Sequence, residues 1–495
     1  MRVQVDWLVL VPVLGPAIGA LLLLVVDAIA PRQRVAHLAV ALVALGAGIG
    51  VAGWGALATT SDAPLLTLCL PGPDGACLYA AGAMASVLQV AALGAAAVVV
   101  MMLLGDPLRR PDLDALRGGP AVAVALVLAA TAGATTVVGA QDLAAWLVGL
   151  ELATLPMVGL VALAARREAV QGALTLLVTS ILSFALLAVG VALWTIATGA
   201  ATFSSTGIQA AFASSEHQLV LLAAVVVIIA GLGFKLSLVP FHTWTPITYS
   251  AAATPVTLAL ATVSKVAALG GLITVVQAIS VLSDRAAPRS VAFTLGAVAL
   301  VSMLVGALLA LRQSDPVRLL AWSTVGQAGW VVLPLAALSV AGTNAAAGYL
   351  AAYVVATTVA FAVVHRVHGP VAAEAPVGPR ELSHTGGLAR NHVLLGGALI
   401  LALLSLAGLP PGVIGLVAKI AALQPVAVGG LWPFALVAVV GAVLGVAVYL
   451  RWVAILLGAG RSLRPLQAMP GTRLALILVT VLLVAVSALP ALIFR

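Results

Sequence analysis

Hydrophobic residues form long runs along this chain, separated by short stretches rich in Pro, Gly and Arg. A membrane-spanning helix needs about 20 consecutive apolar residues. Fourteen runs meet this requirement, at 7–28, 36–58, 80–104, 120–139, 143–164, 171–198, 218–239, 255–280, 290–311, 317–338, 343–365, 393–424, 431–457 and 473–492. Pro240 ends the seventh run, and Pro410-Pro411 interrupts the twelfth. The pattern predicts an all-α membrane protein with about fourteen transmembrane helices, of which the seventh and twelfth are discontinuous.

The composition supports a membrane protein and excludes several soluble classes. Of the 495 residues, 63% are hydrophobic and 8% are charged, whereas soluble domains carry roughly 25% charged residues. The mean hydropathy is +1.22. These values exclude a soluble enzyme, a disordered chain and a nucleic-acid-binding domain, so the expected surroundings are a lipid bilayer, with no nucleic acid partner.

The arginines predict an orientation. If the N-terminus lies outside, the inside loops hold 16 of them and the outside holds 4, a positive-inside distribution. The inside set is Arg32, Arg34, Arg109, Arg110, Arg117, Arg166, Arg167, Arg312, Arg318, Arg366, Arg380, Arg390, Arg451, Arg461, Arg464 and Arg473; the outside set is Arg2, Arg285, Arg289 and Arg495. This orientation places Cys69 and Cys77 in one outside loop, where they form either a local disulfide or two free thiols.

A faint internal repeat divides the chain. Spans four to eight and nine to thirteen form two blocks of five, and an odd number of helices inverts the second block relative to the first. In each block the fourth span is interrupted by proline and carries a lysine, a pattern that points to an ion pathway in transporters. We therefore expect a three-helix N-terminal segment (1–119), two five-helix repeats (120–280 and 290–457) and a C-terminal helix (458–495).

Four ionisable residues lie within hydrophobic runs, where charge is costly and usually functional. Glu151 is half-way through the fifth run, and the chain's three lysines are Lys235, Lys265 and Lys419. Burial favours a neutral lysine and a nearby carboxylate favours a charged one. A buried lysine that gains and loses a carboxylate partner is therefore a proton-binding site with two affinities. The alternatives are a structural ion pair for Glu151 and a snorkelling side chain for Lys419.

His242 follows the proline that ends the seventh run. Histidine titrates near physiological pH, which suits a proton relay, and a structural histidine is the alternative. The chain shows no Gly-rich phosphate loop after a strand, no Cys cluster and no paired His with metal-ligand spacing. We expect no cofactor or metal on this chain.

Four segments resemble the antiporter-like, proton-conducting membrane subunits of bacterial NADH:quinone oxidoreductase, respiratory complex I. They are Phe234 to Lys265, the LELATLP around Glu151, Arg318 to Trp330, and Leu404 to Lys419. The resemblance implies two inverted five-helix repeats and a hydrated polar axis in which Glu151 pairs with Lys235, Lys265 is central and Lys419 is on the exit side. Two features depart from the family's pattern: Ile247 replaces an acid, and the stretch from Pro411 to Lys419 is about one residue longer.

The resemblance also implies an activity, partners and a location. The chain would be a proton-translocating subunit of a translocase in the bacterial cytoplasmic (inner) membrane, bound to other membrane and peripheral subunits. NADH, FMN, iron–sulfur clusters and quinone would belong to those partners. A multi-subunit sodium/proton antiporter or a membrane-bound hydrogenase built on the same fold is the alternative, and a transport-inactive membrane scaffold is a third hypothesis.

Overall fold

The computed structural model describes residues 4–31, 33–59, 63–71, 76–105, 119–164, 166–280, 289–368, 380–459 and 469–494. Several arginines used for the orientation lie outside this described part: Arg2, Arg32, Arg109, Arg110, Arg117, Arg285, Arg461, Arg464 and Arg495. Among the described residues, thirteen helices are long and apolar enough to cross a membrane, or up to fourteen if the bent segment Leu382–Ala407 counts as one span. The expected all-α membrane fold is confirmed.

The N-terminal segment consists of three long helices and a hairpin. Its elements are α1 (Trp7–Ile29), α2 (Arg34–Ala58), β1 (Leu65–Cys69), β2 (Cys77–Ala81) and α3 (Ala83–Leu104). The hairpin was not predicted, because each strand has only five residues and β2 overlaps the start of the third hydrophobic run. Cys69 and Cys77 face each other in the antiparallel register and form a disulfide, which decides between the two alternatives left open by the sequence. The Tyr79 hydroxyl of β2 donates a hydrogen bond to the Thr135 carbonyl at 3.0 Å, which connects the hairpin to the helix bundle.

The first block of five spans contains eight helices, because two spans are divided and the short helix α8 lies between α7 and α9. They are α5 (Gly119–Val137), α6 (Leu143–Ala162), α7 (Arg167–Thr198), α8 (Ser205–Ala213), α9 (Ser215–Leu236), α10 (Trp244–Ala251), α11 (Thr254–Ala261) and α12 (Val263–Ser280). The predicted break in the seventh span separates α9 from α10. A second interruption, at Thr262 between α11 and α12, was not predicted.

The second block is built similarly. Its elements are α13 (Arg289–Leu311), α14 (Pro316–Val332), η1 (Leu333–Ala337), α15 (Val340–His368), η2 (Leu382–Thr385), α16 (Leu388–Asn391), α17 (Val393–Ala407), α18 (Val413–Val428) and α19 (Trp432–Leu457), followed by α20 (Pro470–Ala488) and η3 (Pro490–Leu492). The predicted break at Pro410-Pro411 separates α17 from α18. The exact limits of the four expected segments stay a prediction.

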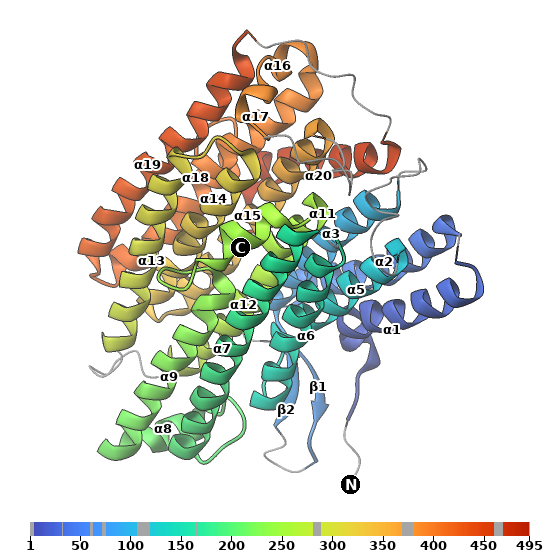
Figure 1. Ribbon diagram of the computed structural model, residues 1–495. Helices are drawn as coiled ribbons and strands as arrows, with labels where there is room; N and C mark the ends of the chain where they lie inside the picture. Colours follow the sequence, from blue (N-terminus) through green and yellow to red (C-terminus); the bar gives the residue numbers. More distant parts are fainter. Residues whose placement is uncertain are drawn as a thin grey trace.

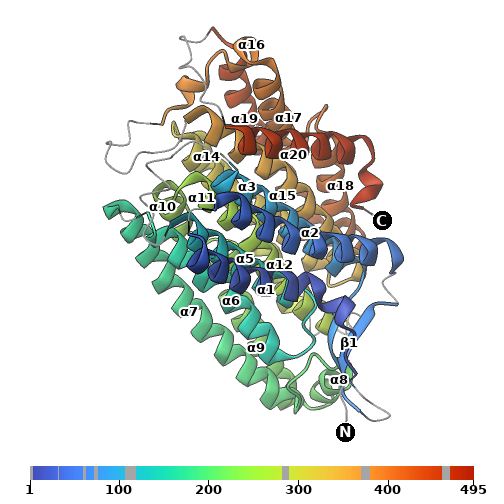
Figure 2. The same ribbon diagram turned by 90° about the vertical axis from the view of Figure 1, so that its right-hand side faces the viewer.

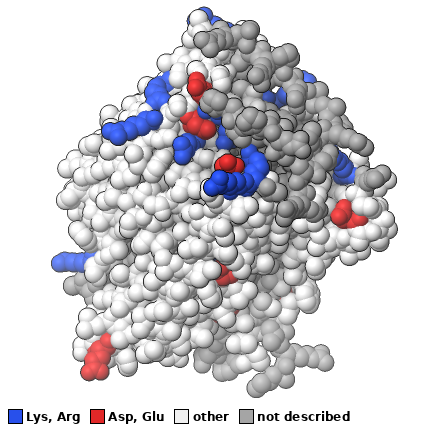
Figure 3. All heavy atoms as spheres, in the orientation of Figure 1, with Lys and Arg blue, Asp and Glu red and all other residues white. Residues whose placement is uncertain are grey.

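Burial distinguishes central from peripheral helices. The most apolar windows of the α11–α12 span and of α15 are 100% buried, whereas those of α2, α7 and α19 are 28% buried. In Figure 1, α12 and α15 lie between the N-terminal helices on one side and α13 and α19 on the other. Figure 2 shows most of the long helices running side by side. Most of the visible described surface is uncharged (Figure 3), as expected for a protein whose sides face hydrocarbon.

Candidate proton-transfer site

The breaks in the seventh and twelfth spans share one backbone construction. α9 ends at Ser237 with φ +65°, and α17 ends at Gly408 with φ +79°. In both helices the amide of the residue after this position bonds back to a carbonyl of the last turn. The Leu238 amide donates to the Gly233 carbonyl and the Leu409 amide donates to the Leu404 carbonyl, each at 2.9 Å. This is a Schellman-type ending. Pro240 lies three residues after Ser237, and Pro411 lies three residues after Gly408. Each break therefore leaves a helix C-terminus, with its unpaired carbonyls and partial negative charge, inside the bundle.

Glu151 and Lys235 form a largely buried ion pair between α6 and the last turn of α9. The Lys235 Nζ lies 2.9 Å from Glu151 Oε1 and also donates to Thr154 Oγ1 at 2.9 Å. Thr154 is one turn beyond Glu151 on α6, so both acceptors face the same ammonium group. The Lys235 side chain is 4% exposed and that of Glu151 is 17% exposed. The two charges that the sequence predicted to pair are thus in direct contact.

Lys265 lies next to this pair and bonds to the end of α9. Its Nζ donates to the Lys235 carbonyl at 2.9 Å and to Ser237 Oγ. The Trp244 ring lies 5.0 Å from the ammonium group, within the range of a cation–π contact. Among the described residues no carboxylate pairs with Lys265, so a helix C-terminus and an aromatic face stabilise its charge.

Lys419 repeats this arrangement in the second block. Its Nζ donates to the carbonyl of Ala407, the last residue of α17, and lies 5.3 Å from the Trp330 ring. Gly408 leaves the lysine little space: a Cβ built there would be 2.8 Å from Lys419 Cδ. Lys265 and Lys419 are therefore both lysines that bind the C-terminus of a half-helix ended by a break.

Uncharged polar side chains form a buried cluster near Lys419. Gln327 of α14 donates to the Leu406 carbonyl at 3.0 Å and to the Tyr449 hydroxyl at 2.9 Å, and it accepts from the Tyr349 hydroxyl at 2.7 Å. Additional contacts at 2.6 and 2.9 Å join Tyr449 to Ser323 and Tyr353 to Thr324. This second-block cluster consists of Ser323, Thr324, Gln327, Tyr349, Tyr353 and Tyr449.

A small cavity adjoins the second-block cluster. Its volume is about 10 Å³, and its lining includes Gln327, Tyr349, Tyr353 and Ser405 together with Ala418, the residue before Lys419. A cavity of ~10–15 Å³ with several polar partners holds one water molecule. The site is therefore large enough for a single bridging water between the cluster and the helix that carries Lys419.

His242 lies at the break, beside the second block. Its ring centroid is 5.3 Å from that of Trp322 in α14. None of the hydrogen bonds among the described residues joins it to Lys235 or Lys265, so its relay role stays a prediction. Trp244, whose ring faces Lys265, was not among the site residues expected from the sequence.

The second-block cluster was also missed. The available signal was the presence of Tyr and Gln inside hydrophobic runs, but such residues also occur as ordinary packing groups. Within the described residues no group of three or more His, Cys, Asp or Glu could hold a metal ion.

The fold and the buried charges define a class: a polytopic membrane protein with paired discontinuous helices and a line of lysines, as in ion-translocating proteins. The sequence model of the family described as NADH:quinone oxidoreductase/Mrp antiporter, TM, matches residues 140–445. The chain belongs to this family.

Similar proteins agree with that assignment. The chain is 38% identical to NADH-quinone oxidoreductase subunit N of Salinispora tropica, over 92% of this chain and 86% of the relative. It is 33% identical to NADH-quinone oxidoreductase subunit N 2 of Streptomyces griseus, over 92% and 83%. A chain of respiratory complex I from Thermus thermophilus superimposes with a TM-score of 0.78 at 28% identity, covering 98% of both chains. The predicted resemblance to the antiporter-like subunits of complex I is confirmed.

The same fold occurs in another complex. A chain of the Mrp complex from Dietzia matches with a TM-score of 0.81 at 21% identity, covering 99% of this chain and 96% of that one. At this identity the match concerns the fold alone. The structural neighbours are thus complex I and related multi-subunit membrane complexes.

Proposed function

We infer that this chain is the subunit N type of proton-translocating membrane subunit in an NADH:quinone oxidoreductase. The single observation that carries the mechanism is the contact series from Glu151 through Lys235 to Lys265, with 2.9 Å from carboxylate to ammonium and 2.9 Å from the Lys235 carbonyl to the next ammonium. The similarity to subunit N relatives over most of the chain supports the assignment to a redox-driven complex.

The proposed transfer is an electrostatic relay. While Glu151 contacts Lys235, the carboxylate favours the charged lysine. If Glu151 moves away, Lys235 loses the only carboxylate that pairs with it among the described residues, and a buried lone ammonium readily releases its proton. The adjacent Lys265 of α12, whose Nζ bonds to the end of α9, accepts that proton when its own amine is neutral. The opposite movement restores the first state.

The second half of the relay uses neutral groups. Lys265 lies in the first block and Lys419 in the second. The second-block cluster, on α14, α15 and α19, supplies hydroxyl and amide groups near Lys419. A hydroxyl both donates and accepts a hydrogen bond, so it passes a proton without holding a charge. One water in the 10 Å³ cavity would complete the connection to α18.

The energy source lies on other subunits. NADH oxidation, FMN, the iron–sulfur clusters and quinone reduction belong to partner subunits, and this chain supplies proton transfer alone. The proposed location is the bacterial cytoplasmic membrane with the N-terminus outside, as the arginine distribution indicates.

Affinity purification through a C-terminal tag tests the assignment. Membranes would be solubilised in mild detergent, the bound partners identified by mass spectrometry, and NADH:quinone activity assayed in the eluate. Co-purification of flavin and iron–sulfur subunits with that activity is the expected result. Recovery of antiporter-like membrane subunits without redox activity would instead assign the chain to sodium/proton exchange.

A further inference from the structure

The half-helix α10 holds part of the Lys265 environment in place. It has eight residues and begins at Trp244, whose ring faces the Lys265 ammonium group at 5.0 Å. The next residue, Thr245, donates to Ser237 Oγ, which also accepts from Lys265. A displacement of α10 would therefore change both the aromatic and the hydroxyl partner of Lys265.

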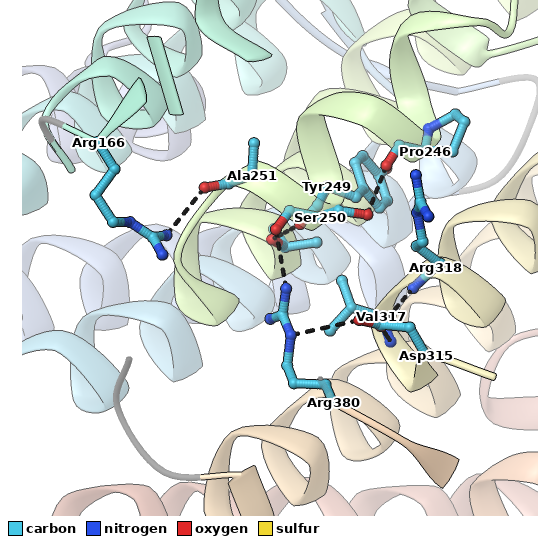
Figure 4. Close-up of polar contacts among 10 residues, drawn as sticks. Arg166, Pro246, Tyr249, Ser250, Ala251, Asp315, Val317, Arg318 and Arg380 are labelled. Atoms are coloured by element: carbon cyan, nitrogen blue, oxygen red, sulfur yellow. Dashed lines mark hydrogen bonds and ion pairs between the residues drawn. The ribbon is translucent and has the colours of Figure 1, made fainter. Parts of the chain in front are cut away.

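Two arginines from different parts of the chain bind the C-terminal end of α10 (Figure 4). Arg166, between α6 and α7, donates to the Ala251 carbonyl at 3.2 Å, and Arg380, ahead of η2, donates to the Ser250 carbonyl at 2.9 Å. Carbonyls at a helix C-terminus lack partners within the helix and favour cations. These two guanidinium groups thus fix the end of α10 opposite Trp244.

Arg380 also contacts the start of α14, in its own block. Its Nε lies 3.5 Å from Asp315 Oδ2, and the other carboxylate oxygen of Asp315 accepts from the amides of Val317 and Arg318 at 2.7 and 3.0 Å. Asp315 is the N-cap of α14. The side chains of Arg380 and Asp315 are 11% and 22% exposed, so this ion pair is largely shielded from solvent.

Arg380 stays charged and is held in place. Burial and the nearby charge of Arg166 lower its pKa, and the Asp315 carboxylate offsets part of this effect; the ordinary pKa of arginine is so high that the group keeps its proton. The backbone beside it is fixed as well, because the Leu382 amide donates to the Ser314 carbonyl at 2.7 Å. One guanidinium group therefore bridges the end of α10 and the start of α14.

This bridge joins two parts of the proposed relay. α10 carries Trp244 and Thr245, which surround Lys265, and α14 carries Gln327, the centre of the second-block cluster. We propose that Arg380 is a positioning residue that couples α10 to α14, so that the Lys265 environment and the second-block cluster keep one relative position during proton transfer. This inference rests on the proposed function and deepens it.

The experiment removes the bridge while it preserves the helix ends. Asn is as good an N-cap as Asp, so Asp315→Asn keeps the start of α14 and removes the charge that Arg380 binds. Arg380→Gln removes the other partner, and Arg390→Gln, an exposed arginine of α16, is the matched control. Each variant would be purified as the assembled complex and assayed for NADH:quinone turnover and for protons moved per NADH in vesicles.

We expect Asp315→Asn and Arg380→Gln each to lower kcat at least about threefold, since small displacements of reacting groups are costly. The KM for quinone should stay unchanged, because quinone binds elsewhere. The double variant should be no worse than the poorer single one, because both changes break one contact. Arg390→Gln should behave like the parent.

Hydrogen–deuterium exchange provides a second readout that does not depend on turnover. In Asp315→Asn the amides of residues 244–251 should exchange faster, while those of 317–332 stay protected. Unchanged exchange in α10, or additive losses in the double variant, would overturn the coupling role. If Arg380→Gln is normal while Lys265→Ala is inactive, the positioning inference fails and the proposed function stands. If Lys265→Ala is also normal, the proposed function itself is wrong.

Discussion

Replacing Glu151 with Gln removes one negative charge from the buried pair and keeps the side-chain size. At the observed 2.9 Å, two unit charges attract by about 6 kcal/mol for an effective dielectric constant near 20. This is an upper bound, because the Glu151 side chain is 17% exposed and water screens part of the field. Removal of one partner from a buried pair typically costs 3–5 kcal/mol. Lys235 avoids that cost by releasing its proton, and a neutral Lys235 no longer alternates between two states.

We therefore expect Glu151→Gln to lower the proton-coupled turnover of the assembled complex at least about tenfold. A tenfold loss corresponds to roughly 1.4 kcal/mol of the attraction between Glu151 and Lys235. Proton movement would be followed with a pH-sensitive dye in NADH-energised vesicles, and assembly by native electrophoresis. The matched control is Glu168→Gln. Glu168 is an exposed acid in the first turn of α7, and its replacement should leave proton-coupled turnover unchanged. Glu151→Asp keeps the charge at a longer distance and should retain an intermediate rate. Pumping by Glu151→Gln at the parent rate, in an intact complex, would refute the relay mechanism.

Other substitutions test separate parts of the site. Lys265→Ala should abolish coupled turnover with the complex assembled, while Lys265→Arg keeps the contacts with the α9 end but cannot release a proton and should also be inactive; pumping by either variant contradicts the central role. Gly408→Ala introduces a side chain at φ +79° and against Lys419, so it should destabilise the protein by more than about 1 kcal/mol, whereas Gly397→Ala, with open space around it, should not lower the melting temperature. Gln327→Leu leaves the Tyr349 and Tyr449 hydroxyls without that partner and should slow proton transfer more than it changes KM; an unchanged rate would exclude the second-block cluster from the path. Ile247→Ala, at a position that is 45% exposed, should reduce turnover less than Glu151→Gln. A larger loss would mean that the proton path runs past Ile247 and that the proposed polar axis is wrong.

The order of the spans and the breaks in the seventh and twelfth spans followed from the sequence alone, whereas the interruption at Thr262 did not. Hydrocarbon excludes unpaired backbone groups, so a spanning segment must be a helix whose apolar length is visible in the residues. Proline cannot donate in a helix interior, which is why Pro240 and Pro411 marked both breaks. The high cost of a charge in hydrocarbon singled out Glu151, Lys235, Lys265 and Lys419 from one sequence.

The tertiary structure decided which groups these charges meet. Lys265 binds a backbone carbonyl of α9, and Lys419 binds that of Ala407; carbonyls are present at every residue, so no pattern of side chains predicts which one is used. Ser323 and Gln327 become a cluster only because α15 and α19 bring tyrosines to them. Arg380 looked like one of many inside arginines, and only the packing of α10 beside the start of α14 makes it a bridge. The length of an apolar run determines which segments span the membrane, whereas contacts between distant segments depend on how the helices pack, and that information appears only in three dimensions.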